Sequence, residues 1–501
     1  MNWTIAPTIL PILTALICLV WGQPRRARRV LVAASATLQL AVALFLVVKT
    51  YGGEAFVVGL GNWSSGLGII LVIDLLSAIM IALSTLIALA SIIYGYFEMS
   101  RKVEHPLRLP LVQFLVAGIN LSFSTGDLFN LFVAFEIMLI ASYALLTLEA
   151  DDWDIKHAFP YFAINLVGST LFICGAGMAY ALFGSLNFAE ISVRAAEMSA
   201  DPRVLALALL FLVIFGIKAG LFPLYFWLPN SYPTLPAPLA ALYAGMLTKV
   251  GVYVLLRFFG TVMPHDLHFA HQLLAWLAGA TMLLAVIGAI SRNFIRGILS
   301  FHILSQIGFM VLAIGFFTPL SIAASIFYIV HHIVVKASLF LIGGVALCLN
   351  RSDNLNRMGN LWRDFPFLGI LFLCQALSLA GLPPLSGFWG KYLIVVAGLD
   401  QQAYVLVGIS IIASVLTLFS MLKIWNAAFW HTSDEVTVAS GDKRARPMTA
   451  VVAVLASISL FIGLGAELFF SISKKAAEQT LDQSRYIELV RSYPGKGTGD
   501  R

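Results

Sequence analysis

The sequence predicts an all-α polytopic membrane protein with about 14 transmembrane helices, two of them broken. Three observations predict this fold class. The chain of 501 residues is 60% hydrophobic and only 11% charged, whereas a soluble domain averages about 25% charged residues. Many of its apolar segments approach or exceed the roughly 20 residues that a transmembrane helix needs. One Gly/Pro motif also occurs inside two such segments, as AGLFPL at 219–224 and AGLPPL at 380–385.

The expected spans follow one another with short loops, so the chain is predicted to form a single membrane domain over 1–501. No loop is long enough for a soluble domain. The spans are expected near 3–21, 30–50, 68–97, 108–125, 127–148, 158–184, 203–228, 236–257, 270–291, 296–316, 319–348, 366–399, 403–430 and 448–470.

Basic residues in the loops predict the orientation of the spans. Most of them fall in alternate loops, near 25–29, 101–108, 292–296, 351–363 and 443–446. The second of these loops contains Arg101 and Lys102. Loops rich in Lys and Arg stay on the cytoplasmic side, so both termini are expected outside a bacterial inner membrane. The net charge of +6 therefore indicates no nucleic-acid partner, and the four cysteines lack metal-ligand spacing.

The repeated motif is expected to break the seventh and the twelfth span. A Phe-Trp pair follows each copy, and a lysine lies close to each, Lys218 and Lys391. Gly and Pro free backbone groups that lipid cannot satisfy, so such a break survives only where protein or water covers it. An odd number of spans separates the copies, which predicts two inverted five-helix repeats, over about 108–257 and about 270–430. Matching breaks in inverted units indicate a transport site.

Charged residues within the spans favour an ion or a proton as the transported species. Each central charge costs about 2.5–3.5 kcal/mol, so a series of them indicates a polar route through the protein. Glu136 and Lys218 are expected to act as a coupled pair; the alternative is a permanent ion pair that fastens two helices. The lysines inside apolar segments are Lys218, Lys249, Lys336, Lys391 and Lys423.

Further candidates extend this route. Lys249 either bridges the two half-paths or caps a carbonyl at another helix break. Lys391 either loads protons at the end of the route or reaches an aqueous surface. His332 and Lys336 are four residues apart and share a helical face. Because imidazole titrates near neutral pH, they are expected to form a proton relay together with His331.

Other polar residues within the spans carry weaker expectations. Asp74 is expected to cap the third span or to contact a neighbouring subunit. Lys423, late in the thirteenth span, is expected to reach the aqueous surface. The tenth span offers three groups that could hold water along the route, namely His302, Ser305 and Gln306.

Several of these segments resemble the antiporter-like subunits that Mrp-type cation/proton antiporters share with respiratory complex I. The resemblance covers about residues 70–430, in matching order and spacing. Within this superfamily the sequence is most similar to the D subunits of Mrp antiporters. The segments that carry the resemblance are FNLFVAFEIMLI at 129–140, KAGLFPLYFWLP at 218–229, PAP at 236–238, LTKVGVY at 247–253, HIVVK at 332–336 and GLPPLSGFWGK at 381–391.

The resemblance implies a secondary transporter subunit rather than an enzyme. It implies a proton-translocating subunit that works with other Mrp subunits, exchanges protons for Na+ or another monovalent cation, and uses no cofactor or bound metal. The alternative is a proton-pumping antiporter-like subunit of respiratory complex I or of a related membrane-bound hydrogenase. Lys391 argues against one complex I relative, which has glutamate there. The expected proton pathway consists of Glu136, Lys218, Lys249, His332, Lys336 and Lys391.

Overall fold

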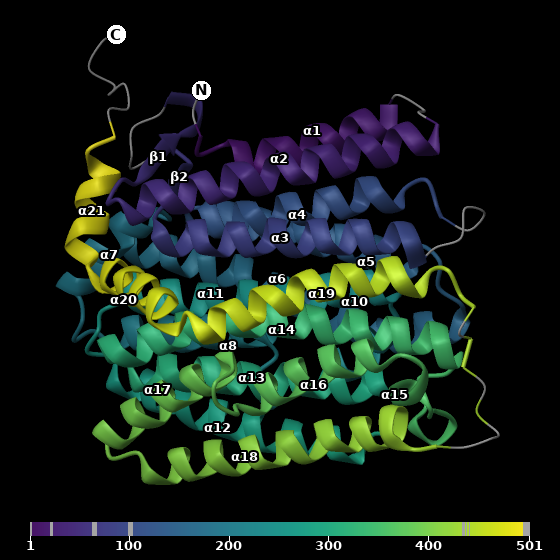
Figure 1. The fold of residues 1–501 in the computed structure, drawn as a ribbon. Coiled ribbons are helices and arrows are strands. Elements are labelled where there is room, and N and C mark those ends of the chain that lie inside the picture. The colour runs from purple at the N-terminus through teal and green to yellow at the C-terminus, as the bar shows by residue number, and fades with distance from the viewer. Residues whose placement is uncertain are drawn as a thin grey trace.

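The computed structural model shows long helices that run side by side in one bundle (Figure 1). It describes residues 3–20, 24–62, 68–98, 104–432, 436, 438–439 and 441–493. Arg101 and Lys102, which contribute to the predicted charge asymmetry, lie outside the described residues.

Most of the described chain before the first break is helical. Its elements are α1 (Ala6–Val20), α2 (Arg25–Tyr51), β1 (Phe56–Gly59), η1 (Leu60–Asn62), β2 (Ile70–Ile73), α3 (Leu75–Glu98), α4 (Arg108–Ser124), α5 (Leu128–Thr147), α6 (Asp152–Phe183), α7 (Phe188–Glu197) and α8 (Pro202–Ala219).

The remaining elements fall between the two breaks and after the second. Between them lie α9 (Leu228–Ser231), η2 (Tyr232–Thr234), α10 (Ala237–Leu242), η3 (Tyr243–Leu247), α11 (Thr248–Arg257), η4 (Phe258–Val262), α12 (His268–Ser291), α13 (Ile295–Phe316), α14 (Pro319–Asn350), η5 (Leu355–Arg357), α15 (Leu361–Asp364) and α16 (Pro366–Ala380). After the second break lie α17 (Ser386–Asp400), α18 (Tyr404–Ile424), η6 (Trp425–Trp430), α19 (Ala445–Leu464), α20 (Ala466–Leu481) and α21 (Gln483–Arg491).

The helices have the length and composition that the sequence predicts for a multi-pass membrane protein. Among the described residues, 11 helical segments are long and apolar enough to cross a membrane. Three shorter apolar helices, α1, α4 and α16, accompany them. The predicted fold class is therefore confirmed, whereas the count of about fourteen spans and the inverted repeat stay predictions.

The most buried spans of the bundle all carry candidate residues. The apolar stretch from α10 to η4 is 100% buried, that of α13 is 94% buried and that of α14 is 89% buried, against 33% for α2. α14 packs against α3, α10, α13, α16, α17, α19 and α20. A charge on any of these segments therefore faces other helices and not lipid.

Two regions differ from a purely transmembrane bundle. β1 and β2 form a short antiparallel hairpin between α2 and α3. β1 lies in a predicted loop, but β2 replaces the start of the span predicted over 68–97, so that α3 begins only at Leu75. The chain after α19 also continues as two more helices, α20 and α21, which the span pattern does not predict. α21 lies at the same end of the bundle as the start of α1 and the hairpin (Figure 1).

Candidate functional site

The two copies of the repeated motif end two helices in the same way. α8 stops at Gly220 and α16 at Gly381, which take left-handed φ values of 81° and 92°. Glycine adopts this conformation without a Cβ penalty. Each glycine N–H donates to the carbonyl four residues earlier, at 2.9 and 3.0 Å. A cis-proline follows each, at Phe222-Pro223 and Pro383-Pro384. The predicted breaks are thus present and share one local geometry.

Lys218 lies in the last turn of α8 and reaches across to α6. Its Nζ donates to Asn165 O at 3.3 Å, to Asn165 Oδ1 at 3.2 Å and to Ser169 Oγ at 3.4 Å. Ser169 Oγ in turn donates to Glu136 Oε1 at 2.5 Å. The expected pair of Lys218 and Glu136 is therefore linked through a hydroxyl group, and in the described part of the chain it forms no direct ion pair. The alternative of a direct ion pair between two helices is thus not what the structure shows, and the coupled role of the two residues stays a prediction.

Lys249 lies just after a π-helical segment, η3. Its Nζ donates to Ala244 O at 2.6 Å and to Thr248 Oγ1 at 3.3 Å. A π-helical turn disturbs the regular pattern of backbone hydrogen bonds and is frequently found at functional sites. The carbonyl cap that the sequence analysis raises as an alternative is thus an observed contact. Lys249 is 0% exposed, so its ammonium depends on these two contacts within the described structure.

His332 and Lys336 lie in the buried centre of α14. η3, which directly precedes α11 and Lys249, packs against α14. Within the described residues, neither ring nitrogen of His332 and no hydrogen of Lys336 Nζ has a hydrogen-bond partner. The Lys336 ammonium does lie over the Phe340 ring, 5.9 Å from its centroid. The proton relay expected of His332 and Lys336 stays a prediction.

The remaining candidates, His331 and Lys391, lie at the second break. His331 Nδ1 bonds Ser386 Oγ at 2.7 Å, at the first residue of α17. Lys391, one turn further along α17, donates from Nζ to Ala380 O at 3.0 Å. The same ammonium lies 4.5 Å from the centroid of the Phe309 ring. The structure therefore brings α14 and both sides of this break together around a buried lysine.

The three polar residues of the tenth predicted span lie in α13 and contact other side chains or backbone. His302 Nε2 bonds Ser420 Oγ at 2.5 Å, and Gln306 Nε2 donates to Thr417 Oγ1 at 3.4 Å. Ser305 Oγ donates to Met282 O at 3.1 Å. The proposed water-holding role of these residues stays a prediction.

Asp74 caps a helix as expected, whereas the expectation that Lys423 reaches the aqueous surface stays a prediction. Lys423 Nζ donates to Ile290 O at 3.0 Å and to Arg292 O at 2.7 Å, near the end of α12. Asp74 Oδ1 accepts the Ser77 N–H at 3.0 Å and so caps α3. Asp74 also pairs with Arg257, a partner that the sequence analysis does not predict.

Several polar residues of the site have no distinctive signal in the sequence. Asn165, Ser169 and Ser386 each contact a candidate lysine or histidine. Serine and asparagine occur singly in many apolar segments, and a single position shows no periodicity. Asn165 and Ser169 are four residues apart and hence on one face of α6, which is the only pattern that could have indicated them.

A comparison with known proteins identifies the family. The family described as NADH:quinone oxidoreductase/Mrp antiporter, transmembrane, matches residues 125–417. The chain belongs to this family. The match includes every member of the expected proton pathway, from Glu136 to Lys391.

Relatives within the NADH:quinone oxidoreductase/Mrp antiporter family match over nearly the whole chain. The D subunit of the Na(+)/H(+) antiporter of Alkalihalophilus pseudofirmus is 39% identical over 493 residues, covering 98% of this chain and 99% of the relative. The D subunit of the Bacillus subtilis Na(+)/H(+) antiporter is 34% identical over 489 residues, with 98% and 99% covered. A chain of the Mrp complex from Dietzia sp. has a TM-score of 0.90 at 28% identity, with 98% and 99% covered. A chain of respiratory complex I from Thermus thermophilus shares the fold, with a TM-score of 0.80 at 23% identity, covering 96% and 99%.

Proposed function

We propose that this chain is the proton-translocating D subunit of a multi-subunit Mrp-type antiporter. The complex exchanges protons for Na+ or another monovalent cation and is driven by the proton motive force. Two relatives named as the D subunits of Na(+)/H(+) antiporters, similar over 98% of the chain, support this proposal. Its partners are other Mrp subunits in a bacterial membrane. Both termini face outside, in line with the basic loops.

The contact chain from Lys218 through Ser169 to Glu136 carries the proposal. An ammonium, a hydroxyl and a carboxylate in hydrogen-bonded sequence can pass a proton along, because a hydroxyl both donates and accepts. Lys218 and Glu136 are bridged by one hydroxyl group and form no ion pair within 4 Å in the described structure. At an effective dielectric of 20, two unit charges about 5 to 6 Å apart interact by about 3 kcal/mol. A carboxylate that gains or loses a proton therefore changes how firmly the lysine holds its own. Lys249, His332, Lys336 and Lys391 extend the same route toward the second break.

The test is cation-driven exchange in vesicles that contain the intact complex. Glu136→Ala and Lys218→Ala are each expected to reduce the Na+-driven pH change by roughly 100-fold, the scale of a positioned proton-transfer group. The matched control is Lys49→Ala, because the Lys49 side chain is 42% exposed and pairs with the 54% exposed Glu54, at 2.9 Å. No redox donor is added, so exchange by the parent complex also separates the antiporter from the redox-driven alternative. Near-normal exchange in both variants, with assembly preserved, would remove the pair from the mechanism.

A further inference from the structure

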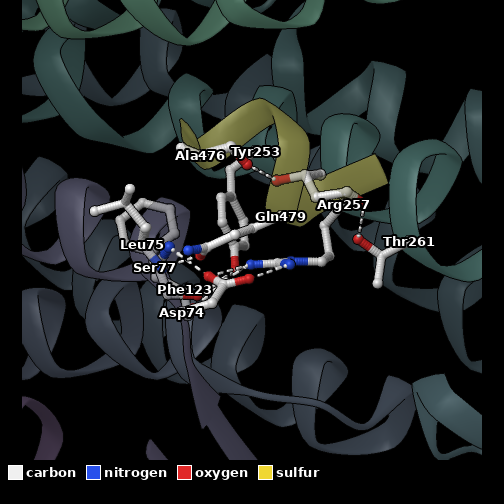
Figure 2. Close-up of polar contacts among 10 residues, drawn as sticks. Asp74, Leu75, Ser77, Phe123, Tyr253, Arg257, Thr261, Ala476 and Gln479 are labelled. Atoms are coloured by element: carbon white, nitrogen blue, oxygen red, sulfur yellow. Dashed lines mark hydrogen bonds and ion pairs between the residues drawn. The ribbon is translucent and has the colours of Figure 1, made fainter. Parts of the chain in front are cut away.

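A second buried charged cluster, separate from the candidate lysines, lies where the start of α3 meets the end of α11 (Figure 2). Arg257 Nη1 and Nη2 donate to Asp74 Oδ2 and Oδ1 at 2.6 and 2.8 Å. The two side chains are 5% and 8% exposed. Arg257 Nη2 also donates to Ser77 Oγ and Tyr253 OH, both at 3.2 Å. Such two-pronged pairs fix geometry as well as charge.

Arg257 ends the short helix that carries Lys249. α11 runs from Thr248 to Arg257 and lies between two π-helical segments, η3 and η4. It is a regular helix, so its two charged residues are about 12 Å apart along its axis. π-helical segments interrupt the regular hydrogen-bond ladder on both sides. The pair with Asp74 ties the C-terminal end of α11 to the start of α3, at the point where the regular ladder ends.

The same helix touches the first break. A Cβ on Gly251 would lie 2.4 Å from Ala219 N and 2.8 Å from the carbonyl carbon of Lys218. α11 thus packs directly on the backbone that holds Lys218. A shift of α11 would change the position of Lys249 and the packing behind Lys218 together.

The C-terminal helices cover the ion pair. Gln479 Oε1 accepts the Leu75 N–H at 3.2 Å, and Thr261 Oγ1 donates to Thr480 O at 2.9 Å. The Tyr486 ring centroid lies 5.9 Å from Arg257 Cζ. α20 and α21 therefore shield the pair from water, which strengthens its electrostatic attraction.

We infer that Asp74 and Arg257 are a positioning pair, which anchors α11 so that Lys249 sits between Lys218 and the charges of α14. The inference rests on the proton-transfer role proposed above for Lys249. The charged and titratable groups around Lys249 and the anchor are His332 and Lys336 from α14, Tyr253 from α11 itself and Tyr486 from α21. Without the anchor, α11 moves and Lys249 loses its close contact with Ala244 O. Because that contact stabilises the charged ammonium, its loss moves the pH dependence of exchange toward lower pH.

The experiment compares single substitutions with a swap of the pair, in the intact complex. Asp74→Asn and Arg257→Gln are expected to lower exchange per assembled complex roughly tenfold, with half-maximal exchange shifted by about one pH unit to lower pH. The double variant Asp74→Arg/Arg257→Asp keeps an ion pair at this place. It is expected to recover part of the exchange rate and part of the wild-type pH dependence. Arg203→Gln is the matched control, because Arg203 pairs with Asp201 at 2.6 Å while 70% exposed.

A milder variant covers the case in which the single changes prevent assembly. Arg257→Lys keeps the positive charge but cannot donate two parallel hydrogen bonds to Asp74. It is therefore expected to assemble and to show a smaller shift of half-maximal exchange toward lower pH. A wild-type pH profile in every assembled variant, Arg257→Lys included, would overturn the inference. Lys249→Ala is measured in parallel: if it exchanges normally, the proposed route fails, whereas if only the anchor variants are normal, the anchor alone fails.

Discussion

The two helix breaks have the same local backbone geometry, but their lysines make different contacts. In the first half, Lys218 precedes Gly220 and reaches out to α6, where Ser169 connects it to Glu136. In the second half, Lys391 follows Gly381 and folds back to Ala380 O across its own break. Among the described residues, no carboxylate forms an ion pair with Lys391.

Lys218 is thus linked to a carboxylate, whereas Lys391 contacts a backbone carbonyl. The protonated state of Lys218 depends on a neighbour that can itself change charge. In the part of the chain that the structure describes, the Lys391 ammonium contacts a carbonyl and the Phe309 ring, neither of which can titrate. Under the proposed function, the first break would respond to the charge of Glu136, whereas the second would not depend on a neighbouring carboxylate.

The largest expected effect tests whether the second half needs a titratable group at all. Lys391→Met fills a similar volume but cannot titrate, so it is expected to lower exchange by roughly 100-fold or more. Lys391→Glu can still hold and release a proton and is expected to retain part of the exchange. Its pH optimum shifts to lower values, because a carboxyl releases its proton at lower pH than an ammonium.

These two variants are compared by Na+-driven pH change in vesicles at equal amounts of assembled complex. If methionine supported exchange as well as lysine, Lys391 would be a structural residue. The two breaks would then differ in kind, with only the first taking part in proton transfer.

A second comparison replaces the glycine at each break. A left-handed alanine costs about 1–2 kcal/mol, so Gly220→Ala and Gly381→Ala should both lower the thermal stability of the complex. The added methyl groups meet different neighbours, Leu304 Cδ2 and Lys391 Cδ, both at 2.8 Å. Gly381→Ala must therefore displace the lysine from Ala380 O and should slow exchange several-fold more than Gly220→Ala.

Melting temperature and exchange per complex are both measured for the two glycine variants. The comparison fails if Gly381→Ala loses stability but keeps the exchange rate of Gly220→Ala. That outcome would mean that the contact of Lys391 with the backbone carbonyl has no part in its function.

The smallest expected effect concerns one hydroxyl in each half. Ser169→Ala removes the link between Lys218 and Glu136, a loss of about 1 kcal/mol or roughly fivefold in exchange rate. Among the described residues, Ser378 Oγ contacts Ser386 Oγ at 3.0 Å and bonds no lysine. Ser378→Ala is therefore expected to reduce the exchange rate by less than half as much as Ser169→Ala. Equal rates for the two variants would show that the hydroxyl bridge does not distinguish the halves.

The breaks and the lysines were accessible to prediction because their signals are local. Gly and Pro terminate a helix wherever they stand, and a lysine in an apolar segment is conspicuous by composition. Which helices contact each other could not be predicted in this way. α6 and α14 are apolar on nearly all faces, so their periodicity does not show which side faces Lys218 or Lys249. The bridge through Ser169 and the contact of Lys249 with Ala244 therefore could not be predicted.

The sequence by itself determined that this chain is a helical membrane protein with two matched breaks and charges inside its spans. Hydrophobic length and residue chemistry are sufficient for that, since lipid admits few backbone arrangements. Only the tertiary structure decided that Arg257 closes on Asp74, far away in the sequence, and that α20 covers them both. Long-range pairing of this kind depends on how whole helices pack. The sequence around a single charge near the end of a span does not indicate which residue it pairs with.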